Sequence, residues 1–186
     1  KLDETPDVIK FAQTLEKVCV ETIEAGKMTK DLAICIHGNK VPEGSYLHTE
    51  DFLDELAKNL RAKLAKDRIP AMLEYVENCE EQGVPLVVFS AHLTPIDAFL
   101  GRPGWACITG DTKPEARQMI VNAFQAGQLK GVALTITAGG VGLTLTRAWK
   151  ALFVDLEWNP SSNSQAEDRI CRIGQMANVA PELEQR

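Results

Sequence analysis

The sequence lacks a long apolar run, a leader-like start and a paired cysteine motif. No stretch approaches the roughly 20 uninterrupted apolar residues that a membrane span needs, and Lys1-Leu2-Asp3-Glu4 lacks the charged-then-apolar pattern of a signal peptide. We therefore expect a soluble, intracellular protein with no membrane partner. The five cysteines form no Cys-x-x-Cys pair, which favours reduced, mostly buried thiols and predicts no metal site.

The sequence also has fewer basic residues than acidic ones. The 20 Lys and Arg residues against 26 Asp and Glu residues give a net charge of −6. This balance argues against indiscriminate binding of nucleic acid by a broad basic surface, and leaves binding through a local patch open. Because the first residue is Lys1 and the last residues are polar, we expect the sequence to be part of a larger protein.

The residues that are present predict helices in the first third of the chain. With 186 residues, 45% of them hydrophobic, the chain can form one sizeable core. Apolar residues at helical spacing predict helices over residues 7–25 and 50–66, with a short strand at about 32–36 between them. A third helix is expected to begin at Pro70 and stop at Gly83. We interpret residues 1–68 as a helical linker or protrusion and residues 69–186 as a separate unit.

From Pro85 onward, short apolar runs alternate with helical segments. Residues 86–89, 105–109, 132–137 and 151–154 are predicted to be strands, and helices should begin near Thr94 and Thr112, each within a capping box. This alternation is typical of an α/β fold in which helices flank a parallel sheet.

Polar residues and glycines follow all four predicted strands. In open α/β sheets, ligands bind beyond the carboxyl ends of the strands. The residues expected at that edge are Ser90, Ala91 and His92; Gly110, Asp111 and Thr112; Ala138, Gly139, Gly140, Val141 and Gly142; and Asp155, Glu157, Trp158, Asn159 and Pro160. Each could be an ordinary turn residue, but their coincidence at one edge predicts a binding site.

The last predicted helix, residues 162–173, carries two different stripes. Gln165, Arg169 and Arg172 recur at helical spacing on one side. The opposite stripe is apolar and is expected to pack on the sheet: Ala166, Ile170 and Ile173. Guanidinium groups on a rigid element are suited to phosphate oxygens, although two arginines on a helix also occur as plain solvated surface.

Taken in order, these segments resemble the second RecA-like lobe of Swi/Snf-type ATPases, in helicase superfamily two. The resemblance covers about residues 69–175. It is carried by Val87-Val88-Phe89-Ser90, Ile108-Thr109-Gly110-Asp111-Thr112, Thr137-Ala138-Gly139-Gly140-Val141-Gly142-Leu143, Trp158-Asn159-Pro160 and the string Gln165-Ala166-Glu167-Asp168-Arg169-Ile170-Cys171-Arg172-Ile173-Gly174-Gln175. Such enzymes are DNA-dependent ATPases that translocate on duplex DNA and remodel what is bound to it.

The resemblance implies a role for each matching residue. Arg169 and Arg172 would be arginine fingers that reach ATP held by another lobe. The ATP cleft would also include Gln165, Gly140, Gly142 and Thr144. The residues expected to contact DNA are Ser90, His92, Gly110, Thr112, Thr135, Thr137, Ala138, Gly139, Trp158 and Asn159. Backbone amides and hydroxyls of this kind hold phosphates without reading sequence.

The sequence departs from the family pattern at three positions, and it lacks the phosphate-binding loop and the acidic box of an ATPase. Thr144 replaces the usual Asn, Cys171 the usual His and Thr137 a common basic residue. No Gly-x-x-x-x-Gly-Lys-[Ser/Thr] loop occurs, and Asp54-Glu55-Leu56-Ala57 imitates an acidic box only on the polar face of a helix. The resemblance thus implies that the N-terminal RecA-like lobe of the same polypeptide holds most of the ATP and Mg²⁺, and that double-stranded DNA is the partner.

Two alternatives remain. A Rossmann dinucleotide site fits poorly, because the third glycine of Gly-x-Gly-x-x-Gly would fall on Leu145 and about eight residues to the next strand are too few for a crossover helix. A non-catalytic RecA-like module that docks DNA or protein is the second alternative.

Overall fold

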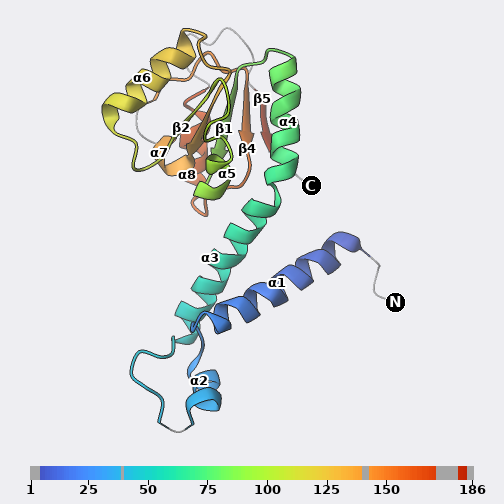
Figure 1. Cartoon of the computed structure of the whole chain (residues 1–186), viewed down its shortest axis with the longest axis vertical. Coiled ribbons are helices and arrows are strands. Elements are labelled where there is room, and N and C mark those ends of the chain that lie inside the picture. The colour runs from blue at the N-terminus through green and yellow to red at the C-terminus, as the bar shows by residue number, and fades with distance from the viewer. Residues whose placement is uncertain (1–4, 39, 140–142, 171–179, 184–186) are drawn as a thin grey trace. The chain divides into compact units, whose positions relative to one another are not determined.

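The computed structural model of the chain describes residues 5–38, 40–139, 143–170 and 180–183. The chain divides into two compact units, Lys1–Leu64 and Ala65–Arg186, whose elements are labelled in Figure 1. Among the described residues, no helix combines the length and the apolar character needed to cross a membrane.

The first unit consists of three helices, α1 (Pro6–Glu24), α2 (Lys30–His37) and α3 (Thr49–Asp67), the last of which ends beyond the unit's boundary. The contact between α1 and α3 includes Thr22, whose hydroxyl donates to the carbonyl of Val18 at 2.7 Å and accepts from Nδ2 of Asn59 at 3.0 Å. The two long predicted helices are therefore confirmed.

The short strand predicted at residues 32–36 is wrong, since these residues lie in helix α2. Asp31 in its first turn and His37 in its last turn suit the helix dipole. Gly38, at φ 70°, ends the helix with a backbone conformation that favours glycine. A run of apolar residues this short fits a strand or a helix equally well, and here the local end signals favour the helix.

The second unit is an α/β structure built on a parallel sheet. Its five strands lie in the order β2-β3-β1-β4-β5. The strands are β1 (Leu86–Ser90), β2 (Trp105–Ile108), β3 (Gly131–Thr135), β4 (Lys150–Phe153) and β5 (Ala180–Leu183). The first four confirm the predicted strands, whereas β5 was not predicted. The third strand ends at Thr135, earlier than expected, because the chain turns there into the short helix α7 (Ile136–Gly139).

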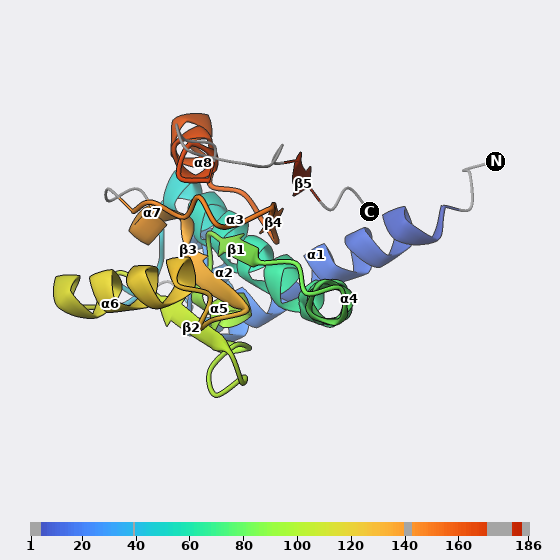
Figure 2. The same ribbon diagram turned by 90° about the horizontal axis from the view of Figure 1, so that it is seen from above.

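Helices cover both faces of this sheet (Figure 2). Successive residues of β1 point to opposite faces: Val87 and Phe89 join a core with α6 (Pro114–Gln125), α7 and α8 (Pro160–Glu167), while Leu86 and Val88 join a core with α4 (Ile69–Glu81) and α5 (Leu93–Asp97). Burial on both faces explains why β1 is a continuous apolar run.

Three helix ends differ from the sequence interpretation. Helix α6 begins at Pro114 without a side-chain cap, because the hydroxyl of Thr112 accepts from the amide of Thr109 instead. Helix α5 already includes Thr94. Helix α8 ends at Glu167, so Arg169 lies in the turn that follows it, where its amide donates to the carbonyl of Ala166.

Candidate functional site

The carboxyl ends of four strands place the predicted binding residues in one row. The register pairs Ser90 with Thr135 and Ile108 with Leu134, so the ends of β2, β3, β1 and β4 lie side by side in that order. With a strand spacing of about 4.8 Å, the row is roughly 14 Å long. We call this row of strand ends the rim.

At the centre of the rim, Ser90, His92 and Asp155 tie β1 to β4. The Ser90 side chain is fully buried; its hydroxyl accepts from the amide of His92 at 3.0 Å and donates to that residue's carbonyl at 2.8 Å. Oδ1 of Asp155 accepts from the amide of Ala91 at 2.7 Å, and its Oδ2 lies 3.6 Å from Nε2 of His92. These bonds fix the turn after β1.

At the end of β2, Arg117 of α6 holds the loop that contains Gly110 and Thr112. Its guanidinium donates to the carbonyls of Thr109, Gly110 and Thr112 at 2.8–3.0 Å. The loop therefore has a fixed shape, while Gly110 itself is exposed and Thr112 is half-buried.

The end of β3 presents one exposed hydroxyl and one buried hydroxyl. Thr135 is 5% exposed, and its Oγ1 has no hydrogen-bond partner among the described residues. Thr137 is exposed on α7, whereas Ala138 and Gly139 are buried. A Cβ on Gly139 would lie 3.1 Å from Leu134 and 3.2 Å from Phe89, so the glycine allows α7 to pack closely on the sheet.

Beyond β4, a clamp presents Trp158 to solvent. Asn163 accepts from the amide of Glu157 at 2.9 Å and donates to its carbonyl at 3.0 Å. Asn159 caps α8 by accepting from the amide of Ser161 at 3.1 Å. Trp158, held between these two anchored neighbours, is 81% exposed.

The residues predicted for the ATP cleft are only partly described. Gln165 is exposed on α8, and Arg169 is half-buried, with its carbonyl accepting from the amide of Leu145 at 3.0 Å. Thr144 is half-buried, and its carbonyl accepts from Nε2 of Gln125. Gly140, Gly142 and Arg172 lie outside the described residues. Among those that are described, no cluster of three His, Cys, Asp or Glu residues could hold a metal ion.

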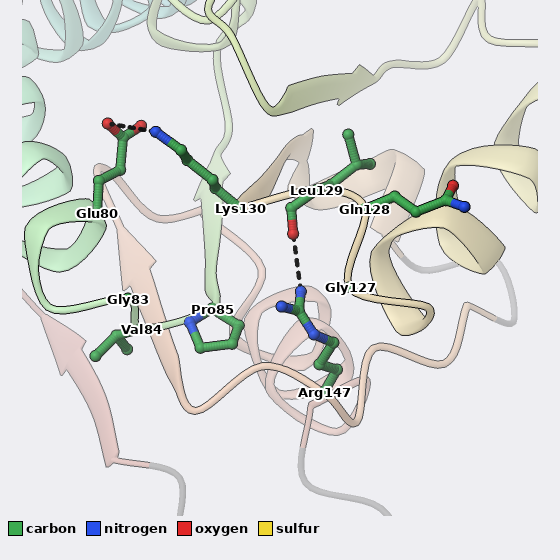
Figure 3. Close-up of a pocket in the computed structure, with 9 residues that line it drawn as sticks. All are labelled: Glu80, Gly83, Val84, Pro85, Gly127, Gln128, Leu129, Lys130 and Arg147. Atoms are coloured by element: carbon green, nitrogen blue, oxygen red, sulfur yellow. Dashed lines mark hydrogen bonds and ion pairs between the residues drawn. The ribbon is translucent and has the colours of Figure 1, made fainter.

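The opposite, amino-terminal edge of the sheet holds a small cavity of about 130 Å³ (Figure 3). The Arg147 guanidinium lines it and donates to the carbonyls of Phe124 and Leu129 at 3.1 and 2.8 Å. Glu80, on the same cavity, lies 3.7 Å from Lys130. These polar groups pack the loops before β3 and β4, and they do not lie at the rim.

Sequence comparison assigns this second unit. The profile of the helicase conserved C-terminal domain matches residues 67–174, more than half of the chain. The chain belongs to this family. The match begins near the start of α4 and ends beyond α8, so it includes the rim that the structure assembles.

A solved structure supports the same fold for the helicase C-terminal domain. The crystal structure of the C-terminal part of the Fun30 ATPase domain aligns with a TM-score of 0.54 and 19% sequence identity, over 82% of this chain and 48% of that one. The expected RecA-like α/β fold is thereby confirmed. The chain spans about half the length of this structural relative.

A different class of protein is also similar to part of the chain. NADP-dependent isocitrate dehydrogenases match over 64 to 68 residues: the mitochondrial enzyme of Sus scrofa is 57% identical over 68 residues, that of Homo sapiens 56% identical over 68 residues, and the cytosolic enzyme of Arabidopsis thaliana 48% identical over 64 residues. The matches cover 34–36% of this chain but only 15–16% of those enzymes.

Two residues that organise the helicase C-terminal domain's rim were not recognised in the sequence. Arg117 lies on α6, Asn163 lies on α8, and each hydrogen-bonds to a loop beyond its own helix. A single polar residue on an amphipathic helix looks like ordinary surface in the sequence. Asp155 differs from these residues, because it directly follows a predicted strand and was expected at this edge from the sequence.

Proposed function

We propose that this chain is the second motor lobe of a DNA-dependent ATPase of Swi/Snf type, which translocates on duplex DNA and remodels protein–DNA complexes or DNA structures. The single observation that carries the proposal is the rim: in a helicase C-terminal domain, four strand ends form one row, and the segment that follows β4 exposes Trp158 (81%). We also propose that the protein acts inside the cell, on DNA.

The rim is suited to a phosphate backbone because it is rigid and offers exposed backbone. The hydroxyls of Ser90 and Thr112 accept hydrogen bonds from backbone amides of the turns in which they lie. Gly110 and Thr137 are exposed, so in this proposal they meet the phosphates, while Ser90 and Thr112 shape the loops. Trp158 would lean into the minor groove. Contacts of this kind give affinity without sequence preference.

Arg169 and Arg172 would act as arginine fingers on ATP bound mainly, with Mg²⁺, by the N-terminal RecA-like lobe. The backbone hydrogen bond from Leu145 to Arg169 anchors the first finger beside the loop that contains Thr144. Fingers stabilise the charge that develops on the transferring phosphoryl group, but they do not hold nucleotide and magnesium. The isolated chain should therefore not hydrolyse ATP at any DNA concentration.

The test is single-turnover ATP hydrolysis, with saturating DNA, by the protein that contains both lobes. Arg169→Lys and Arg172→Lys should each lose roughly a thousandfold in turnover, because an ammonium cannot supply the planar fork. Arg61→Lys, an exposed position on α3, serves as the matched control and should behave as wild type. Hydrolysis by both finger variants within a factor of about three of wild type would show that the assignment is wrong.

DNA binding by the chain alone separates this proposal from a dedicated docking module. Binding should be weak, indifferent to sequence and strongly reduced by salt, because the contacts are few and directed at phosphates. A tight, sequence-selective complex at high salt, together with a two-lobed protein that binds DNA but does not hydrolyse ATP, would instead support the non-catalytic docking module.

A further inference from the structure

Helix α4 begins beside the rim. It leads into β1 through the short loop 82–85 and packs on the sheet through Met72, Val76 and Cys79, so it lies alongside the strands in Figure 1. A helix that is joined to the start of a strand by so short a loop runs back along the sheet in the opposite direction. The first residues of α4 therefore lie at the carboxyl edge of the sheet.

Arg68 stands at a break between α3 and α4, and its side chain reaches the end of β4. Pro70, in the first turn of α4, has no amide hydrogen for the carbonyl of Lys66, so the helix cannot continue unbroken from α3. The Arg68 side chain is half-buried, and its Nη1 donates to the carbonyl of Val154 at 2.8 Å. Val154 is 2% exposed, so this bond satisfies a carbonyl in a buried residue.

The carbonyl of Val154 is the one that β1 would bond next. The two strands form a parallel ladder, in which the amide of Val154 donates to the carbonyl of Phe89 at 2.9 Å. In a parallel ladder, the following bond would join the amide of Ala91 to the carbonyl of Val154. Instead, the Ala91 amide donates to Oδ1 of Asp155 at 2.7 Å, and Arg68 donates to the carbonyl. Two side chains thus end the ladder between β1 and β4.

Residues 155–159 leave the sheet at the point where this ladder ends. They include Trp158, which is 81% exposed, and the clamp in which Asn163 bonds the backbone of Glu157. The bond from Arg68 lies at the start of this segment, and the clamp lies within it. A buried carbonyl that loses its donor costs free energy until the chain moves and finds another donor or water. Loss of Arg68 should therefore displace the start of the segment.

We propose that Arg68 is a positioning residue for the DNA contact: by holding the carbonyl of Val154, it fixes the direction in which residues 155–159 leave the sheet, and so the place at which Trp158 meets the duplex. The inference rests on the proposed function for its partner, duplex DNA. Arg68 acts through the segment and does not itself touch DNA. The rival is a purely structural role, in which Arg68 stabilises the second unit as a whole.

The test compares Arg68→Gln with Lys66→Gln in the full 186-residue chain. Lys66 is exposed, so both variants lose one positive charge, but only Arg68→Gln loses the bond to Val154, because a glutamine side chain is too short to make it. Hydrogen exchange of the amides in residues 155–159 should become roughly tenfold faster in Arg68→Gln, since a bond from a charged donor contributes about that factor to a local opening equilibrium. It should not change in Lys66→Gln, and the amides of β1 and β3 should exchange at the wild-type rate in both variants.

DNA affinity provides the second readout, measured by the fluorescence anisotropy of a labelled duplex of arbitrary sequence at low salt. Arg68→Gln should bind roughly tenfold more weakly than wild type, because the contact of a large aromatic side chain is worth about one factor of ten. Lys66→Gln should stay within about threefold of wild type. Arg68→Lys should also stay within about threefold in both readouts, since a single N–H to a single carbonyl does not need the planar fork of a guanidinium.

The inference is overturned if Arg68→Gln and Lys66→Gln give equal exchange in residues 155–159, or if the segment exchanges faster while DNA affinity stays at the wild-type level. Equally faster exchange in β1 and β3 would overturn it in favour of the purely structural role. If the wild-type chain binds no duplex, the proposed function fails, and with it the DNA part of this inference, whereas the exchange comparison still decides whether Arg68 holds the segment.

Discussion

Replacing Glu80 by Gln should destabilise the helicase C-terminal domain by about 2–3 kcal/mol at neutral pH. The Glu80 carboxylate accepts from Nε and Nη2 of Arg102, at 2.9 and 3.2 Å, and from the indole of Trp105. A glutamine can keep the indole bond, but its amide lacks the charge that the guanidinium pairs with. Hydrogen bonds to charged groups contribute about 1.5–3 kcal/mol each, and they are not additive. The two side chains are 17% and 20% exposed, so the loss should stay below that of a fully buried pair.

The effect should depend on pH with a definite sign. The Arg102 guanidinium holds the pKa of the Glu80 carboxyl below its usual range, against the opposing effect of burial, and the Trp105 hydrogen bond lowers the pKa further. A depressed folded-state pKa contributes stability that is fully present above the unfolded-state pKa, about 4.3 for Glu, and is lost as the pH falls through the folded-state pKa. The gap between wild type and Glu80→Gln should therefore be complete at pH 7 and close in acid.

Urea unfolding followed by tryptophan fluorescence measures this gap. Trp105 is 8% exposed, whereas Trp149 and Trp158 are 56% and 81% exposed, so the emission shift on unfolding comes mainly from Trp105. The control is Glu77→Gln: this carboxylate is 63% exposed and 3.7 Å from Arg102, and its loss should cost less than about 0.5 kcal/mol. Equal stability of Glu80→Gln and wild type, or a gap that persists in acid, would refute the reasoning.

Two further substitutions test how the sheet and the rim are held. Gly131→Ala should cost about 2 kcal/mol in urea unfolding, because its added Cβ would overlap the Trp105 ring. Gly110→Ala, with no atom within 4 Å of the added Cβ, should change stability by less than about 0.5 kcal/mol; equal effects of the two substitutions would contradict this packing. Asn163→Ala removes both bonds to the residue before Trp158, and should increase hydrogen exchange in this loop while leaving the sheet's protection unchanged; unchanged exchange in the loop would show that the clamp is dispensable.

The sequence predicted the helices and strands correctly wherever buried residues recur along an element in a regular pattern. The four predicted strands are continuous apolar runs because both faces of the sheet are covered, and α1 and α3 show an apolar spacing that only a helix explains. The strand prediction for residues 32–36 was wrong for the opposite reason. This apolar run is too short to show a periodic pattern, so the residues at the ends of α2 decided its structure.

The candidate site likewise has features that the sequence determines and features that only the tertiary structure decides. The sequence by itself determined which residues follow each strand, and parallel strands necessarily bring those residues to one edge. Only the tertiary structure decided the strand order that makes them a row, the burial of Ser90 against the exposure of Trp158, and the long-range bonds by which Arg117 and Asn163 hold the loops. The physical reason is that periodicity records the environment of a whole element, whereas a hydrogen bond between one side chain and a distant backbone group leaves no periodic trace in the sequence.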